Sequence, residues 1–224
     1  MNFRTAFLSI LLLSGYGYVH AQHSGQGAGP PSPPIPLEVF AGNEYLNFQM
    51  IISKPFAPGS RFSFFNVTSF NGDYQNDEGE NEYITQGLLN YEVFKGLSVA
   101  TGATMHYRTG FRPTAGLNYV FGSRKWLFVL LPRFDLSDDY NFETFSLLEF
   151  KPPITKDIGL YTRIQGLYNH NTEQDFHDRS YLYFRVGLSY RKYQAGLGAN
   201  FDRYGPGEID TENYGLFIRA QIAN

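Results

Sequence analysis

The chain of 224 residues contains no cysteine, which excludes disulfide bonds, thiolate metal sites and a lipid anchor on an N-terminal cysteine. It also lacks a glycine-rich phosphate loop, a zinc-ligand spacing and a nucleotide-binding motif, so we expect no cofactor. Acidic residues outnumber lysine and arginine by 21 to 18, which argues against a nucleic-acid partner.

Long hydrophobic runs are absent as well. The apolar run from Ala6 to Leu13 is too short to span a bilayer as a helix. Arg4 precedes it and the cleavage-site pattern Val19-His20-Ala21 follows it, so residues 1–21 are predicted to be a signal peptide, with an uncleaved N-terminal anchor as the alternative. Residues 22–36, "QHSGQGAGPPSPPIP", are predicted to be an extended or disordered lead-in before a domain over 37–224.

Aromatic residues are abundant, with 17 Tyr and 21 Phe, and they occur in segments whose apolar and polar residues alternate. Since side chains of a strand point to opposite faces in turn, the alternation predicts β-strands with one apolar face. In "SYLYFRVGLSY", residues 180–190, Leu182 and Val186 share one face and Arg185 lies on the other. The segment "RFSFFNVTSF" does not alternate cleanly, so its facing stays open, and Pro132 marks a weakened strand or a bulge.

The pattern predicts about twelve strands and no helix. They are expected at 36–41, 45–53, 61–70, 82–93, 97–108, 112–121, 125–135, 142–150, 158–168, 179–191, 193–203 and 213–223. Ten strands is the alternative, if neighbouring segments merge.

The connections between these segments fall into two alternating sets. All six lysines lie in or beside the short set: Lys54, Lys95, Lys125, Lys151, Lys156 and Lys192. The other set, mostly longer, carries most of the acids: Asp73, Asp77, Glu78, Glu80, Asp138, Asp139, Glu173, Asp175, Asp178, Glu208, Asp210 and Glu212. Alternate connections of an up-and-down meander emerge at opposite ends, so one end should be basic and the other acidic.

A sheet that spans a bilayer must close on itself, with short turns at the periplasmic end and longer loops outside. In these features, residues 37–224 resemble the bacterial outer-membrane β-barrel superfamily, in particular the small barrels of Bacteroidota-type bacteria. The resemblance implies an all-β, transmembrane antiparallel up-and-down barrel in the cell outer membrane, in contact with membrane lipid and lipopolysaccharide. An even strand number places both ends of the domain in the periplasm.

The predicted inner face carries many ionisable residues. The candidates for lining the lumen are His106, Arg108, Arg112, Arg133, Asp135, Glu143, Glu149, Arg163, Arg185, Asp202 and Arg219. They predict either a narrow channel or binding path for small solutes, or a plugged structural or adhesive barrel in which arginines pair with carboxylates. The arginine excess of this set favours polar or anionic solutes.

A lipid-modifying barrel enzyme is a third possibility, but it would need a histidine beside a serine or paired acids at the outer rim. His106, His170 and His177 lie near that rim without an evident serine partner in the sequence, so we expect no enzymatic activity. The acidic clusters "NDEGE" and "SDD" could bind Ca²⁺ or Mg²⁺ or could be solvated loops, and neither has the full spacing of a calcium loop.

Overall fold

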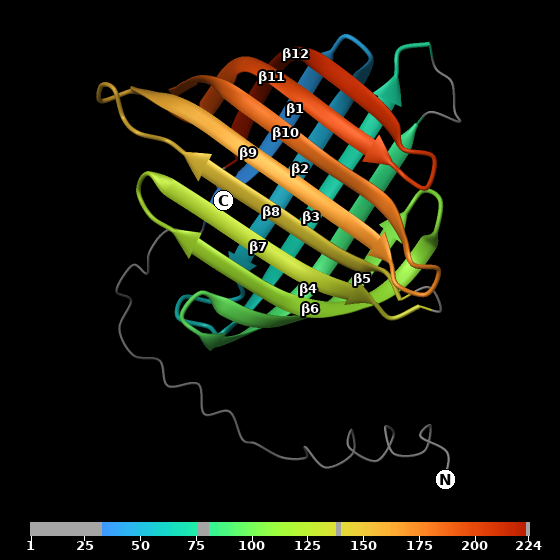
Figure 1. The fold of residues 1–224 in the computed structure, drawn as a ribbon. Coiled ribbons are helices and arrows are strands. Elements are labelled where there is room, and N and C mark those ends of the chain that lie inside the picture. The colour runs from blue at the N-terminus through green and yellow to red at the C-terminus, as the bar shows by residue number, and fades with distance from the viewer. Residues whose placement is uncertain (1–32, 76–80, 138–139, 223–224) are drawn as a thin grey trace, which may run out of the picture. The chain divides into compact units, whose positions relative to one another are not determined.

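A computed structural model describes residues 33–75, 81–137 and 140–222. The predicted signal peptide and most of the lead-in therefore lie outside the described residues. The rest forms a closed barrel of twelve strands, which confirms the predicted fold and strand number and makes the ten-strand alternative wrong (Figure 1). The strands are β1 (Ile35–Gly42), β2 (Tyr45–Pro55), β3 (Phe62–Asp73), β4 (Glu82–Phe94), β5 (Leu97–His106), β6 (Gly110–Gly122), β7 (Trp126–Asp135), β8 (Phe142–Phe150), β9 (Ile158–Asn171), β10 (Phe176–Tyr190), β11 (Tyr193–Tyr204) and β12 (Ile209–Ile222).

Each strand pairs antiparallel with its neighbours in the sequence, and β1 pairs with β12 to close the ring. The seam runs from Ile35 opposite Ile222 to Gly42 opposite Gly215. Closure leaves no open sheet edge, which is the condition for a sheet to lie in lipid. No helix of the described residues is long and apolar enough to cross a membrane.

The two ends of the barrel differ as predicted. The turns after β2, β4, β6, β8 and β10 lie at one end, called here the turn end, together with the start of β1 and the finish of β12. Each of the six lysines lies in one of these turns or close beside it. The connections after β1, β3, β5, β7, β9 and β11 emerge at the opposite end, called here the loop end, and each carries acidic residues except the one after β5, which carries Arg108.

Some strand boundaries differ from the predicted ones at the loop end. β10 begins at Phe176 and β12 at Ile209, three and four residues earlier than predicted, and β9 continues to Asn171. These polar extensions pair with each other, as Phe176 does with Asn171, so their backbone groups are bonded without needing an apolar face. β5 instead ends at His106, two residues early.

Pro132 lies inside β7 without a bulge. It is the register partner of Thr144 on β8, whereas the pairing with β6 is interrupted between Arg133 and Leu130. Proline has no backbone N–H to donate, which accounts for the local gap on one side.

The outer face of the barrel is apolar. On β10, Leu182, Val186 and Leu188 are exposed there and Arg185 points inward, as predicted. The open question of "RFSFFNVTSF" is also answered: Phe65 and Val67 are buried inside, and Phe62 and Phe64 are exposed outside.

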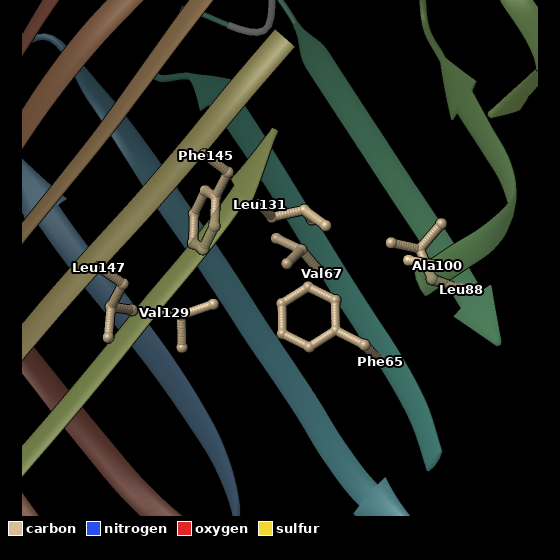
Figure 2. Packing of buried hydrophobic residues seen from close by; sticks show 8 residues of the cluster. All are labelled: Phe65, Val67, Leu88, Ala100, Val129, Leu131, Phe145 and Leu147. Carbon is tan, nitrogen blue, oxygen red and sulfur yellow. The ribbon is translucent and has the colours of Figure 1, made fainter. Parts of the chain in front are cut away.

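Part of the lumen is apolar, which corrects the prediction of a polar inner face. One buried cluster comes from β3, β4, β5, β7 and β8, and its members point into the barrel (Figure 2): Phe65, Val67, Leu88, Ala100, Val129, Leu131, Phe145 and Leu147. β7 and β8 carry apolar residues on both faces, so alternation did not single out these inner residues, although they share the inward parity of Arg133 on β7 and Glu143 on β8. The cluster fills one side of the interior in the way a soluble core would.

The lumen cluster should contribute to stability like a protein core. Replacing Phe65, which is fully buried, with Ala should lower the free energy of unfolding by about 3–5 kcal/mol because it leaves a cavity. The measurement is urea unfolding in detergent, followed by the heat-modifiable migration of the folded barrel on a gel. Leu188→Ala on the outer face is the control and should cost much less, and equal losses in both variants would contradict a packed lumen.

Candidate functional site: the charged lumen wall and the outer vestibule

The structure places the predicted lumen residues as follows. Ten lie on strands and face the interior: His106, Arg112, Arg133, Asp135, Glu143, Glu149, Arg163, Arg185, Asp202 and Arg219. Arg108 lies in the turn after β5, is exposed and lines the outer cavity. Their position in the barrel is established, whereas their role in selectivity stays a prediction.

An outer bridge crosses the lumen near the loop end. Arg179 of β10 pairs with Glu82 of β4 at 3.1 Å and with Asp202 of β11 at 2.8 Å. Five strands separate β10 from β4 in either direction round the ring, so the first pair joins opposite walls. Tyr204 and Tyr107 also donate hydrogen bonds to Glu82, at 3.0 and 2.7 Å. This bridge narrows the interior below the loops.

A middle bridge is centred on Glu38 of β1, which is only 1% exposed. Its Oε1 accepts hydrogen bonds from Arg163 of β9 at 2.6 Å and from Arg185 of β10 at 2.8 Å. The Arg185 guanidinium also lies over the ring of Phe40, 4.1 Å from the centroid. Gly198 makes room for this stack, since a Cβ there would lie 2.9 Å from both Arg185 and the Phe40 ring.

An inner bridge lies toward the turn end. Glu149 of β8 pairs with Arg219 of β12 and with Lys151, the latter at 2.7 Å, and accepts a hydrogen bond from Tyr161 of β9 at 3.1 Å. Arg219 also contacts the Tyr161 hydroxyl. Three strands lie between β8 and β12, so this bridge also spans part of the lumen.

A fourth charged group runs along neighbouring strands. Arg133 of β7 pairs with Glu143 of β8 at 2.7 Å and also contacts Asp135. Arg112 of β6 lies 3.5 Å from Asp135, and Asn169 of β9 donates to Glu143 at 3.0 Å. The group forms the boundary between the apolar cluster and the loop end.

A cavity, called here the vestibule, opens at the loop end and has an empty volume of about 1130 Å³ with its open solvent included. Four arginines and four acidic residues line it: Arg108, Arg112, Arg133, Arg179, Glu82, Asp135, Glu143 and Asp178. The wall also contains tyrosines and apolar residues: Tyr107, Tyr181, Tyr183, Tyr204, Val67, Ile84, Phe145 and Leu167. The vestibule can therefore take a small solute with polar and apolar parts.

Sequence reasoning missed three residues that carry these bridges: Glu38, Glu82 and Arg179. Glu82 and Glu38 have the inward-facing parity of their strands, which was the available signal, whereas Arg179 lies beside a bulge after His177 that shifts the register. Leaving out these residues changes the count of positive and negative charges inside the barrel. The fully buried charges are five arginines and five carboxylates: Arg112, Arg133, Arg163, Arg185, Arg219 and Glu38, Asp135, Glu143, Glu149, Asp202. The predicted arginine excess is therefore compensated inside the barrel.

The structure also brings a serine to a rim histidine, which the sequence did not reveal. His177 Nε2 lies 2.9 Å from the hydroxyl of Ser180, and His170 Nε2 lies 3.2 Å from Asp175. In the described chain His177 has no ion pair with a carboxylate that could orient its ring. The pair therefore lacks the third member of a hydrolytic triad.

The predicted cation clusters fall mainly outside the described residues, which omit 76–80 and 138–139. Within the described ranges, no group of three or more His, Cys, Asp or Glu side chains is arranged to hold a metal ion.

The middle bridge gives a sharp test of the lumen electrostatics. Glu38→Gln should lower the free energy of unfolding by about 3–5 kcal/mol, because it leaves the buried charges of Arg163 and Arg185 without their carboxylate. Urea unfolding in detergent measures the loss. Asp210→Asn is the matched control, since its pair with Arg203 is exposed on the barrel surface and should matter little. A Glu38→Gln barrel as stable as the control would mean that the bridge is not formed.

Comparison with known proteins gives likeness at the level of the fold. No protein-family model and no curated protein matches the sequence. Among solved structures, the NanC porin in its rhombohedral crystal form is similar with a TM-score of 0.52 and 10% identity, over 86% of this chain and all of that one. The KdgM porin is similar with a TM-score of 0.44 and 12% identity, over 84% of this chain and 98% of that one.

The barrel is closed and antiparallel, with an apolar exterior and no open sheet edge. A β-sheet needs these properties to span a bilayer, and the proteins that span bacterial outer membranes as sheets have them. The protein therefore has the fold of the bacterial outer-membrane β-barrels.

Proposed function

We propose that the barrel is a narrow outer-membrane channel for small polar solutes, closed in this structure by side chains. The observation that carries the proposal is a polar wall on β8 to β12 and β1, with a buried aromatic cluster of Phe40, Tyr161 and Phe217 among its charged groups. It runs from Arg179 in the vestibule through the Glu38 bridge to Glu149 and Lys151 near the turn end. The described loops lie at the two ends of the barrel (Figure 1). Along this wall, therefore, only side chains of the described residues close the lumen.

The composition of the wall supports transport over a purely structural role. Buried ion pairs stabilise a protein weakly, because desolvation offsets their attraction. A twelve-stranded interior is wider than that of an eight-stranded barrel and could be filled by apolar residues, as β3 to β8 show. The arginines of the bridges have long side chains that can change rotamer without backbone movement, so the path can open by breaking ion pairs alone.

The balance of charge changes the solute that the wall favours. Since five buried arginines face five buried carboxylates, the interior has no excess of positive charge to select anions. The acidic loop end should repel anions further. We therefore propose small polar solutes of low net charge, in place of the anionic preference.

A plugged structural barrel is the second candidate, and complete burial of both sides of the lumen favours it. Phe65, Leu131 and Glu149 are all 0% exposed, so the interior is closely packed around each of them. In either case we propose that the exposed apolar exterior contacts outer-membrane lipid and lipopolysaccharide. Binding of divalent cations at the acidic loops stays a prediction.

Conductance separates the two candidates. In planar bilayers the wild-type barrel should conduct weakly, and Arg185→Ala should raise the single-channel conductance several-fold, because it removes a side chain that closes the middle of the lumen. Arg203→Ala, an exposed arginine on the outer side of β11, is the control and should leave conductance unchanged. If neither the wild type nor Arg185→Ala conducts while both remain heat-modifiable, the barrel is a plug.

A direct assay tests the expected absence of catalysis. The purified barrel should not hydrolyse phospholipid or p-nitrophenyl esters above the rate of empty detergent micelles, because the Ser180–His177 pair lacks an orienting acid. Hydrolysis that disappears in Ser180→Ala but persists in Ser189→Ala, a second serine of the same strand, would establish an enzyme.

A further inference from the structure

We propose that the vestibule binds a small zwitterion with an apolar group, of the amino-acid class, and that Gln86 and Thr104 bind its carboxylate. The inference deepens the proposed function, since it takes the vestibule as the first binding position of the transported solute. It starts from polar atoms in the vestibule wall that the protein itself leaves without partners.

Gln86 and Thr104 form a pair of unused hydrogen-bond donors. They lie opposite each other in the register of β4 and β5, both line the vestibule, and they are 4% and 2% exposed. Neither Gln86 Nε2 nor Thr104 Oγ1 has a hydrogen-bond partner among the described residues. A buried donor without a partner destabilises the protein, so a solute that accepts both bonds regains that free energy.

A carboxylate matches this pair better than a neutral acceptor does. The next residue in the row is Arg112, the register partner of Thr104 on β6, and it also lines the vestibule. Arg112 is engaged with Asp135 at 3.5 Å, so it contributes positive charge beside the two donors rather than a vacant bond. Two adjacent donors next to a guanidinium suit two carboxylate oxygens, since hydrogen bonds to an ionised acceptor are the stronger ones.

The vestibule wall also offers acceptors for an ammonium group. Asn141 Oδ1 is buried and has no partner among the described residues, and the Asn141 amide nitrogen lies 3.4 Å from the Asp178 carboxylate. Both residues line the cavity. Asp175 and Glu208 lie in described connections at the same end and add negative potential there, which favours a solute with a positive group over a simple anion.

Apolar side chains complete the site. Val67, Ile84, Phe145 and Leu167 line the same cavity, and Val67 and Phe145 belong to the buried lumen cluster. Charged solutes without an apolar part would leave these surfaces in contact with water, whereas an apolar side chain would cover them. The cavity thus holds donors for a carboxylate, acceptors for an ammonium group and an apolar surface. These three features match an amino acid with an apolar side chain.

The probes are L-phenylalanine and analogues that each lack one group. Calorimetry on the folded barrel in detergent should show L-phenylalanine binding at least tenfold more tightly than 3-phenylpropionate, which lacks the ammonium group, and than 2-phenylethylamine, which lacks the carboxylate. Glycine, without the apolar group, should bind more weakly too. Equal binding of 3-phenylpropionate would mean an anion site, and preferential binding of glucose would mean a neutral-solute site. Either result overturns the proposal.

Variants connect the binding to the two donors. Gln86→Leu combined with Thr104→Val should weaken L-phenylalanine at least tenfold and leave 2-phenylethylamine unchanged, because only the carboxylate loses its partners. Gln49→Leu is the matched control, since Gln49 is another buried lumen glutamine with an unpartnered side-chain atom, outside the vestibule. Unchanged affinity in the heat-modifiable double variant contradicts the site.

The outcome is independent of transport, since binding is measured on detergent-solubilised protein without a bilayer. Conductance without L-phenylalanine binding would leave the proposed channel standing and remove this inference. Binding in a barrel that never conducts would keep the site and remove the channel.

Discussion

The ion pairs of Glu38 join the first strand of the barrel to strands on the far side of the seam. Its carboxylate holds Arg163 and Arg185, which are 125 and 147 residues away in the chain. The short strand β1 thus has two kinds of attachment: backbone pairing to β12 and β2, and charged contacts across the interior. Because one buried carboxylate pairs with two guanidinium groups, the closure of the sheet and the electrostatics of the lumen depend on the same residue.

The periodic part of the fold could be predicted from the sequence. Alternation is a local property, so it located all twelve strands and the inward face of Arg185 without any knowledge of their partners. The parity of the lysines predicted the two ends, since consecutive strands of a meander run in opposite directions. Alternation did not single out Val129 and Leu131 on β7, because both faces of that stretch are apolar, although both residues share the inward parity of Arg133.

The contacts across the lumen could not be predicted. Whether Arg179 meets Glu82 depends on the register and tilt of strands on opposite walls, and a bulge after His177 shifts the register just before Arg179. The charge of the interior depends on such pairs as well. Counting only the residues that the pattern identified suggested an excess of arginine. Among the buried residues Glu38 removes that excess, and the missed pair of Arg179 and Glu82 adds one charge of each sign. Composition predicted that the lumen is charged, and only the structure shows how the charge is balanced.

The two sides of the lumen differ in how freely they can rearrange. The apolar side, which holds the lumen cluster of β3 to β8, is closely packed, so moving one of its residues leaves a cavity beside the neighbouring side chains. The charged side is held by long guanidinium side chains, and glycines line the strands there: Gly187, Gly196, Gly198 and Gly215. Gly198 gives Arg185 and Phe40 the space that a Cβ would occupy, so the middle bridge depends on the absence of a side chain. A solute that crosses the barrel would therefore pass along β9 to β12 and β1. Its polar groups would replace, one bridge at a time, the partners that the bridge side chains have in the closed state. The apolar side would stay packed and maintain the shape of the barrel.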